Sequence, residues 1–145
     1  MTTNNLCWAL SAIVLILALY ASNAKAETAV LLGGWSDHLV TDGDYNESHE
    51  ATIIEHNSWM AGRFTNSYDR NTWFAGKGWS KQWGNWRGSV HAGVMHGYRS
   101  CYGDDGDNAT VCPMVYPALT YTRYAVQPQV GLLGEAVVAI VRIRL

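Results

Sequence analysis

The sequence predicts an all-β protein, an eight-stranded antiparallel up-and-down transmembrane β-barrel that follows an N-terminal signal peptide. Three observations predict this fold class. Short segments rich in aromatic, β-branched and glycine residues recur along the chain, and a polar turn cluster ends each of them. Longer polar loops alternate with tight turns between these segments. Within the segments apolar and polar side chains alternate, as expected where one face meets lipid and the other a polar lumen.

Residues 1–26 have the anatomy of a secretory signal. An almost wholly apolar run from Leu6 to Ala21 is followed by a small-residue cleavage site, which places the mature start at Glu27. The first five residues lack the Lys or Arg that is usual there. The alternative is an uncleaved helical anchor, but the run is shorter than the roughly 20 residues that a spanning helix needs. We therefore expect a mature barrel domain over 27–145.

Eight candidate strands follow in the mature chain. They run over 28–39, 47–56, 59–66, 72–80, 85–98, 113–121, 125–133 and 136–145. The links after the first, third and fifth are polar and rich in Asp, Asn and Gly, whereas those after the second and sixth are tight. Both termini then lie on the short-turn side, which is the pattern of outer-membrane barrels.

The fifth and last candidate strands indicate which side chains face the lumen. Arg87, Ser89 and His91 alternate with apolar or small residues in the fifth strand. In the last strand Arg142 and Arg144 share one face, and valine, alanine and isoleucine share the other. An arginine on the lipid side costs about 2–4 kcal/mol near the midplane, so we expect both arginines on the lumen face.

Seven Trp and eight Tyr, many near the ends of candidate strands, fit the aromatic girdles of a membrane barrel. The alternative is a soluble sandwich or a lipocalin-like barrel that uses the same aromatics as its core, because eight strands also close a soluble barrel. We expect a monomer in the bacterial outer membrane, with membrane lipid as its partner.

Composition and spacing exclude several classes of function. Without Lys25, nine Lys and Arg face twelve Asp and Glu, a net charge of −3, so nucleic acid is not an expected partner. The histidines show no metal-ligand spacing, and the acidic run over 104–108 lacks the spacing of an EF-hand loop. Neither a Gly-rich phosphate loop nor a nucleophile elbow is present. We expect no metal and no cofactor.

The mature chain keeps two cysteines, Cys101 and Cys112. An even pair in an exported protein predicts a disulfide, because that compartment is oxidising. The alternative is two separate buried thiols.

The order of residues along the mature chain resembles one family. The order is His38 closing the first strand, then Tyr45-Asn46-Glu47, then Phe64 with Ser67-Tyr68, then Ala75-Gly76-Lys77-Gly78-Trp79, then Gly93 to Gly97 and the prolines. It resembles the outer-membrane lipid A palmitoyltransferases of the PagP type over most of the mature chain. That resemblance implies an eight-stranded barrel that moves a palmitoyl chain from a phospholipid to lipid A, with catalytic His, Asp and Ser at the outer rim.

Carried over by position, His38 matches the catalytic His and Ser67 the Ser, while Asn66 stands where the family has Asp. Acyl transfer needs a base that takes a hydroxyl proton, and imidazole suits this role near neutral pH. An amide can hydrogen-bond the ring but cannot offset the charge of an imidazolium, as a carboxylate does.

Three carboxylates lie close enough in the sequence to substitute for the missing one: Asp37, Asp42 and Asp69. The alternative to catalysis is a rim histidine and a loop serine that only bond neighbouring backbone.

Pro113, Pro117 and Pro128 lie in or beside the sixth and seventh candidate strands, where a residue without an N–H weakens pairing. In the resembled family, prolines in this region open lateral gaps through which a lipid chain enters the barrel. The alternative is that Pro113 starts a strand and Pro128 sits at a bulge. A lumen that takes an acyl chain should be apolar in its outer half, and Met95 and Leu133 allow this.

Two hypotheses from different classes follow. The first is an acyltransferase that acts on lipid A or phospholipid at the outer leaflet, with His38 as base and Ser67 as its partner. The second is a non-enzymatic small barrel, of cellular or phage origin, whose outer loops bind something or mask the surface.

Overall fold

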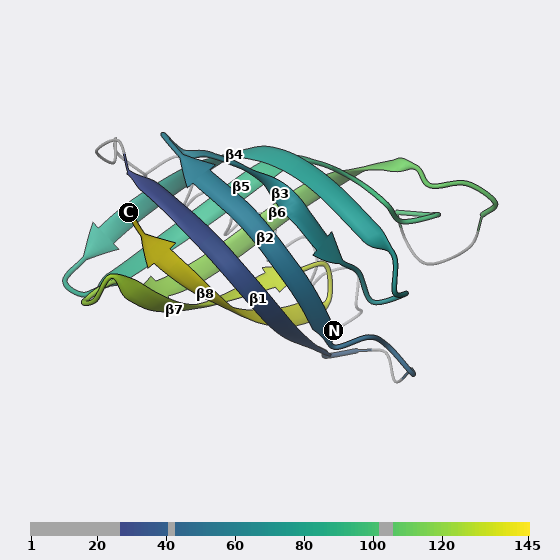
Figure 1. Cartoon of the computed structure of the whole chain (residues 1–145), viewed down its shortest axis with the longest axis horizontal. Helices are drawn as coiled ribbons and strands as arrows, with labels where there is room; N and C mark the ends of the chain where they lie inside the picture. The colour runs from purple at the N-terminus through teal and green to yellow at the C-terminus, as the bar shows by residue number, and fades with distance from the viewer. Residues whose placement is uncertain (1–26, 41–42, 102–105) are drawn as a thin grey trace, which may run out of the picture.

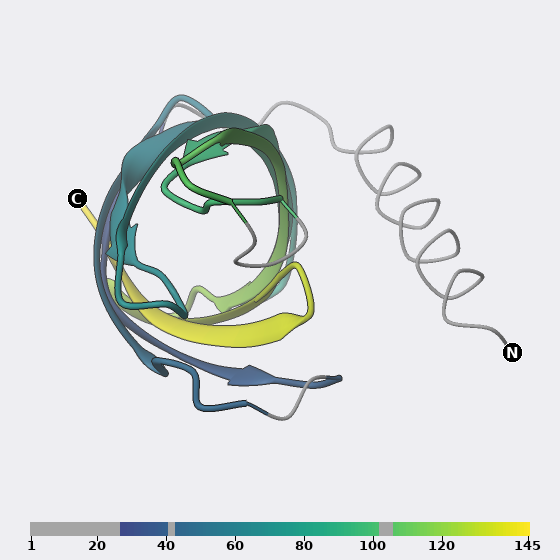
Figure 2. The ribbon, with the colours of Figure 1, turned by 90° about the vertical axis from the view of Figure 1, so that its right-hand side faces the viewer.

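The computed structural model describes residues 27–40, 43–101 and 106–145. The strands are β1 (Thr28–His38), β2 (Ser48–His56), β3 (Trp59–Thr65), β4 (Asn71–Trp83), β5 (Trp86–His96), β6 (Val111–Tyr121), β7 (Val126–Leu133) and β8 (Ala136–Arg144). Each strand pairs antiparallel with the next, and β8 pairs with β1, so that the sheet closes into a ring (Figures 1 and 2). The predicted eight-stranded antiparallel barrel is confirmed. The predicted signal peptide, 1–26, lies outside the described residues.

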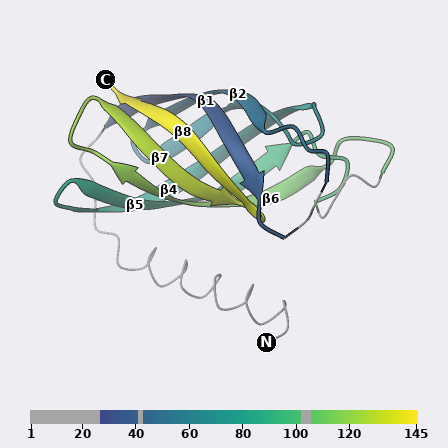
Figure 3. The same cartoon turned by 90° about the horizontal axis from the view of Figure 1, so that it is seen from below.

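The barrel has two unlike ends. At the loop end β1, β3 and β5 finish, and longer links lead to the next strand. At the turn end β2 and β4 finish in two-residue turns, and the Leu145 N–H donates to the Thr28 carbonyl at 3.0 Å. Figure 3 shows β8 lying between β7 and β1, which closes the ring. None of the described residues forms a helix long and apolar enough to cross a membrane.

Two strands extend beyond their predicted bounds. β4 continues to Trp83 rather than ending at residue 80, because Gly84 with a φ of +58° makes the turn there. β6 starts at Val111, two residues before Pro113, so that this proline lies within the strand rather than at its start. The partner strand β5 continues to His96, which pairs with Val111, so the ladder between β5 and β6 includes these two additional residues of β6.

The predicted inward positions of β5, and that of Arg142 in β8, are those found. Arg87, Ser89 and His91 are buried in the lumen, and Arg142 is fully buried with none of its surface exposed. Arg144 has the same phase as Arg142 but is exposed, because it is the last residue of its strand. Period-two alternation therefore placed both strands correctly.

A cluster of buried ions fills the lumen at the turn end. The Glu55 carboxylate accepts from Arg87 Nη2 at 2.5 Å and from Arg142 Nη2 at 3.0 Å. The Glu27 carboxylate accepts from Arg87 Nη1 at 2.8 Å, and Gln127 Oε1 accepts from Arg142 Nη1 at 2.6 Å. Two guanidinium groups thus share two carboxylates, which is the condition under which buried charges are tolerated.

A glycine pair in β1 changes which side chains face the lumen. Gly33 and Gly34 have φ values of +83° and +111°, a region that other residues rarely adopt. The register shifts here against both β2 and β8, which marks a bulge. Odd-numbered residues are buried before it, whereas Ser36 and His38 take the inward positions after it and Asp37 is exposed.

Large apolar side chains cover much of the barrel exterior. Six of the seven tryptophans of the chain are exposed there: Trp35, Trp59, Trp73, Trp79, Trp83 and Trp86. Aliphatic side chains are exposed between them, among them Leu32, Ile54, Val94, Val115, Leu119, Val130 and Val141. An apolar surface of this kind is unusual for a monomer that is surrounded by water.

The predicted disulfide is present. Cys101 and Cys112 are bonded, with 5.3 Å between their Cα atoms, and link the loop after β5 to the second residue of β6.

Replacing Arg142 by Ala should lower the free energy of unfolding by about 3–5 kcal/mol, because Glu55 keeps its buried charge and loses one of its partners. Urea titration of the folded protein measures this. The matched control is Arg144→Ala at the exposed strand end, which should stay within about 0.5 kcal/mol of the wild type. Equal effects of the two substitutions would contradict a stabilising role of Arg142 in the buried ion cluster.

Replacing both Cys101 and Cys112 by Ser should lower the free energy of unfolding by about 3 kcal/mol, because the unfolded chain loses a cross-link between residues 11 apart. The same urea titration checks this. Reduction of the wild type with dithiothreitol should produce a similar loss and leave the double variant unaffected.

Candidate functional site

An apolar cavity of about 530 Å³ occupies the loop half of the lumen. It exists because the inward-facing positions of this half carry apolar side chains, whereas those of the turn half carry the ion cluster. The apolar lining includes Ala51, Ile53, Met60, Phe64, Phe74, Met95, Met114, Tyr116, Leu133 and Ile140. An apolar half of the lumen is therefore present, at the loop end.

His38 and Ser67 meet at the loop end of this cavity. His38 is the last residue of β1, and Ser67 lies in the link between β3 and β4. The Ser67 Oγ is 3.2 Å from the His38 Nε2, and both residues line the cavity. The imidazole stacks on the Tyr45 ring, with ring centroids 4.2 Å apart and planes at 25°. The structure thus brings together two residues that are 29 apart in the sequence, at hydrogen-bond distance.

Asn66 is fully buried beside this pair, but its amide serves the loop. Its Nδ2 donates to Thr72 Oγ1 at 3.0 Å and to the Gly97 carbonyl at 3.3 Å. Its Oδ1 accepts from the backbone N–H groups of Tyr68 and Arg70 at 2.9 and 3.1 Å. These are the contacts of a residue that positions Ser67, and a chemical role for Asn66 stays a prediction.

Of the three carboxylates that could substitute, the two that the structure describes do not join the pair. Asp37 is exposed, because the β1 bulge gives the inward position to His38. Asp69 is exposed in the β3–β4 turn, with a φ of +59°. Asp42 lies outside the described residues.

Sequence reasoning missed Glu135, an acidic residue among those that line the cavity. It follows Gly134 in the tight β7–β8 turn, and its carbonyl accepts from the Leu39 N–H at 3.2 Å, next to His38. The pairing of β8 with β1 places this turn beside His38. Nothing in the local sequence around a glutamate in a turn indicates that neighbour.

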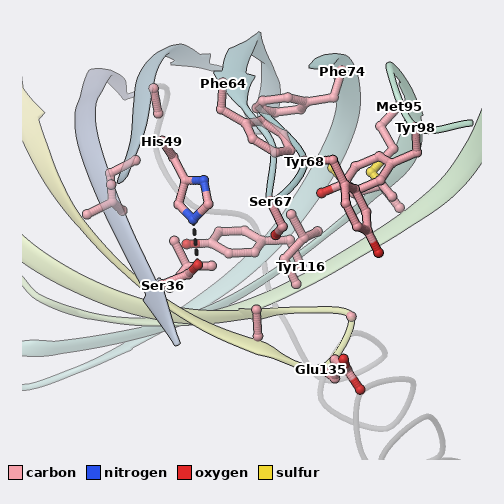
Figure 4. Close-up of a pocket in the computed structure, with 18 of the residues that line it drawn as sticks. Ser36, His49, Phe64, Ser67, Tyr68, Phe74, Met95, Tyr98, Tyr116 and Glu135 are labelled. Carbon is pink, nitrogen blue, oxygen red and sulfur yellow. Dashed lines mark hydrogen bonds between the residues drawn. The ribbon is translucent and has the colours of Figure 1, made fainter. Parts of the chain in front are cut away.

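Two tyrosines form part of the cavity wall beyond Ser67 (Figure 4). The rings of Tyr68 and Tyr98 pack edge to face, with centroids 6.2 Å apart. Burial, together with the neighbouring Tyr68, raises the pKa of Tyr98 to about 12, while a hydrogen bond with Ser67 acts in the opposite direction. Tyr98 therefore stays protonated at physiological pH and is a hydrogen-bonding group rather than a base.

A second histidine and serine, which the sequence pattern did not identify as a pair, lie together on the cavity wall (Figure 4). Ser36 and His49 come from β1 and β2, and their Oγ and Nε2 atoms are 2.5 Å apart. The remaining nitrogen of His49, Nδ1, is 2.6 Å from the Thr65 carbonyl oxygen. The sequence pattern shows only that His49 occupies an inward-facing position of β2. Alternation cannot distinguish a functional histidine at such a position from one that only packs in the interior.

Comparison of the chain with protein-family models, with curated proteins and with solved structures finds no match. The resemblance to PagP-type enzymes therefore stays a prediction. Within the described parts of the chain no three metal-ligating side chains gather at one point.

Replacing Asn66 by Asp, the residue that the resembled family has there, should lower the free energy of unfolding by about 1–3 kcal/mol. The Gly97 carbonyl would lose its donor and face a carboxylate oxygen in a buried place. The control is Asn71→Asp at the exposed start of β4, which should change little. An unaltered stability of Asn66→Asp in urea titration would count against the loop-positioning role.

Proposed function

We propose that the protein is a PagP-like outer-membrane acyltransferase, which acts on lipid A or phospholipid at the outer leaflet. The observation that carries the proposal is the His38–Ser67 pair, at hydrogen-bond distance on the edge of an apolar cavity inside a closed barrel. A base beside a hydroxyl is what acyl transfer requires, and an apolar cavity is what an acyl chain requires.

The barrel exterior supports a membrane location. Exposed tryptophans lie near both ends: Trp35 and Trp73 near the loop end, and Trp59, Trp83 and Trp86 near the turn end. Exposed aliphatic side chains lie between them, as in a membrane barrel with aromatic girdles. Together with the secretory signal expected over 1–26, this favours the outer membrane over a soluble barrel.

The pairing of β6 with β7 supports a lateral route for a lipid chain. It covers three residue pairs, from Ala118 with Gly131 to Thr120 with Gln129, whereas β6 pairs with β5 along its whole length. Pro117 stands next to one end of this short ladder and Pro128 next to the other, and neither has an N–H to continue it. The loop half of β6 extends beyond its ladder with β7, which ends at Leu133, and this stretch lies at the level of the apolar cavity lined by Met114 and Tyr116.

In the proposed reaction an acceptor hydroxyl attacks the carbonyl carbon of a phospholipid ester. His38 Nε2 takes the hydroxyl proton as the new C–O bond forms. The tetrahedral intermediate collapses, the ester C–O bond breaks, and the departing lysophospholipid oxygen takes the proton back from the imidazolium. The acceptor hydroxyl takes the place of the Ser67 hydroxyl at Nε2, Ser67 stays beside the reacting atoms as a hydrogen-bonding group, and the acyl chain occupies the cavity.

A non-enzymatic barrel is the second candidate, and one observation favours it. Asn66 stands where the resembled family has a carboxylate, and its amide is fully engaged in holding the loop. In this case the outer loops bind a partner or mask the surface.

Expression of the protein in an outer-membrane host should add an acyl chain to lipid A, and His38→Ala should lower that product roughly 100- to 10,000-fold through loss of the base. Mass spectrometry of lipid A measures it. His56→Ala is the matched control, because His56 is exposed at the turn end and far from the cavity. Heat-modifiable gel migration confirms that each variant is folded. If the folded wild type leaves lipid A unchanged, the acyltransferase proposal is wrong.

A further inference from the structure

The Ser36–His49 pair lies on the cavity wall, apart from His38 and Ser67. Ser36 is two residues before His38 on the same face of β1, so it lies deeper in the barrel. Ser36 and His49 are only 1% and 6% exposed, and both line the apolar cavity. Figure 4 shows the His49 ring directed at the Ser36 hydroxyl, beneath Phe64.

Hydrogen-bond chemistry determines which atom of the pair donates. A carbonyl oxygen can only accept, so the His49 Nδ1 that contacts the Thr65 carbonyl at 2.6 Å carries the hydrogen. In the neutral ring Nε2 then has a lone pair, and the Ser36 hydroxyl donates to it across 2.5 Å. The three groups are therefore arranged as nucleophile, base and orienting acceptor.

The surroundings of the pair also suit a reactive serine. The His49 ring meets Phe64 edge to face, with centroids 6.2 Å apart, so one ring edge is covered by an apolar neighbour. Ala51 and Ile140 line the same cavity. In such surroundings a hydrogen bond is stronger than in water, and the orientation of the imidazole is held by Thr65 on β3. An acyl chain in the cavity would lie against the hydroxyl.

We propose that Ser36 is a nucleophile that takes up an acyl group from a lipid ester, with His49 as its base. The inference rests on the proposed function and replaces its direct transfer by two steps through a covalent acyl-serine. The Ser36 Oγ attacks the ester carbonyl carbon while its proton passes to His49 Nε2. The ester C–O bond then breaks, and the departing alcohol takes that proton. The acyl group remains on Ser36 until an acceptor hydroxyl, activated by His38, displaces it and returns a proton to Ser36.

The test uses the mature protein folded in detergent and a long-chain alkyl fluorophosphonate. The Ser36 Oγ–phosphorus bond forms, the phosphorus–fluorine bond breaks, and the hydroxyl proton leaves with fluoride by way of His49. Peptide mass spectrometry should place the label on Ser36 of the wild type. His49→Gln should slow labelling by about 100-fold or more, because the base is lost. The matched controls Ser89→Ala and His91→Gln remove buried lumen residues of β5 and should label at the wild-type rate.

Absence of label on Ser36 in the folded wild type, or undiminished labelling of His49→Gln, would overturn the inference. Because the site of labelling is mapped on the wild type, that part of the test does not depend on the folding of a variant, and heat-modifiable gel migration checks that His49→Gln is folded. Lipid A mass spectra separate the two proposals. If Ser36→Ala transfers as the wild type does while His38→Ala does not, the covalent stage fails and the proposed function stands. If Ser36 is labelled through His49 but lipid A is unchanged, the proposed function fails and the nucleophile remains.

Discussion

The hydrogen-bond ladder between β1 and β8 is the constraint on which the rest of the structure depends. It runs from Ala29 with Arg144 to His38 with Ala136, and it joins the last strand to the first. Once the ring is closed, alternate side chains have only two destinations, the lumen or the exterior. The closure brings Arg142 to Glu55, 87 residues away in the chain, and it sets the β7–β8 turn beside the end of β1.

The closed lumen is divided by the chemistry of its inward residues. At the turn end the charges of Glu27 and Glu55 neutralise those of Arg87 and Arg142, because an unpaired charge could not be buried there. At the loop end apolar side chains leave a cavity, and the polar groups within it are few. Both histidine–serine pairs therefore lie in a cavity whose lining is mainly apolar.

The candidate chemistry depends on one irregularity in a regular sheet. Without the Gly33–Gly34 bulge, the inward positions after it would fall on Trp35 and Asp37. With it, Ser36 and His38 face the cavity, one against His49 and the other against Ser67. A single added residue thus decides which functional groups of β1 enter the lumen, at the cost of a short interruption of two ladders.

The sequence by itself determined the number of strands, their antiparallel order and the phase of β5 and β8, because a period of two is a local property that each strand displays separately. It also indicated the disulfide and the positions of His38 and Ser67. Only the tertiary structure decided the pairing of Ser36 with His49, the place of Glu135 and the structural use of Asn66. Those depend on contacts between strands distant in the sequence and on a bulge that reverses the alternation, and neither leaves a periodic signal in the chain.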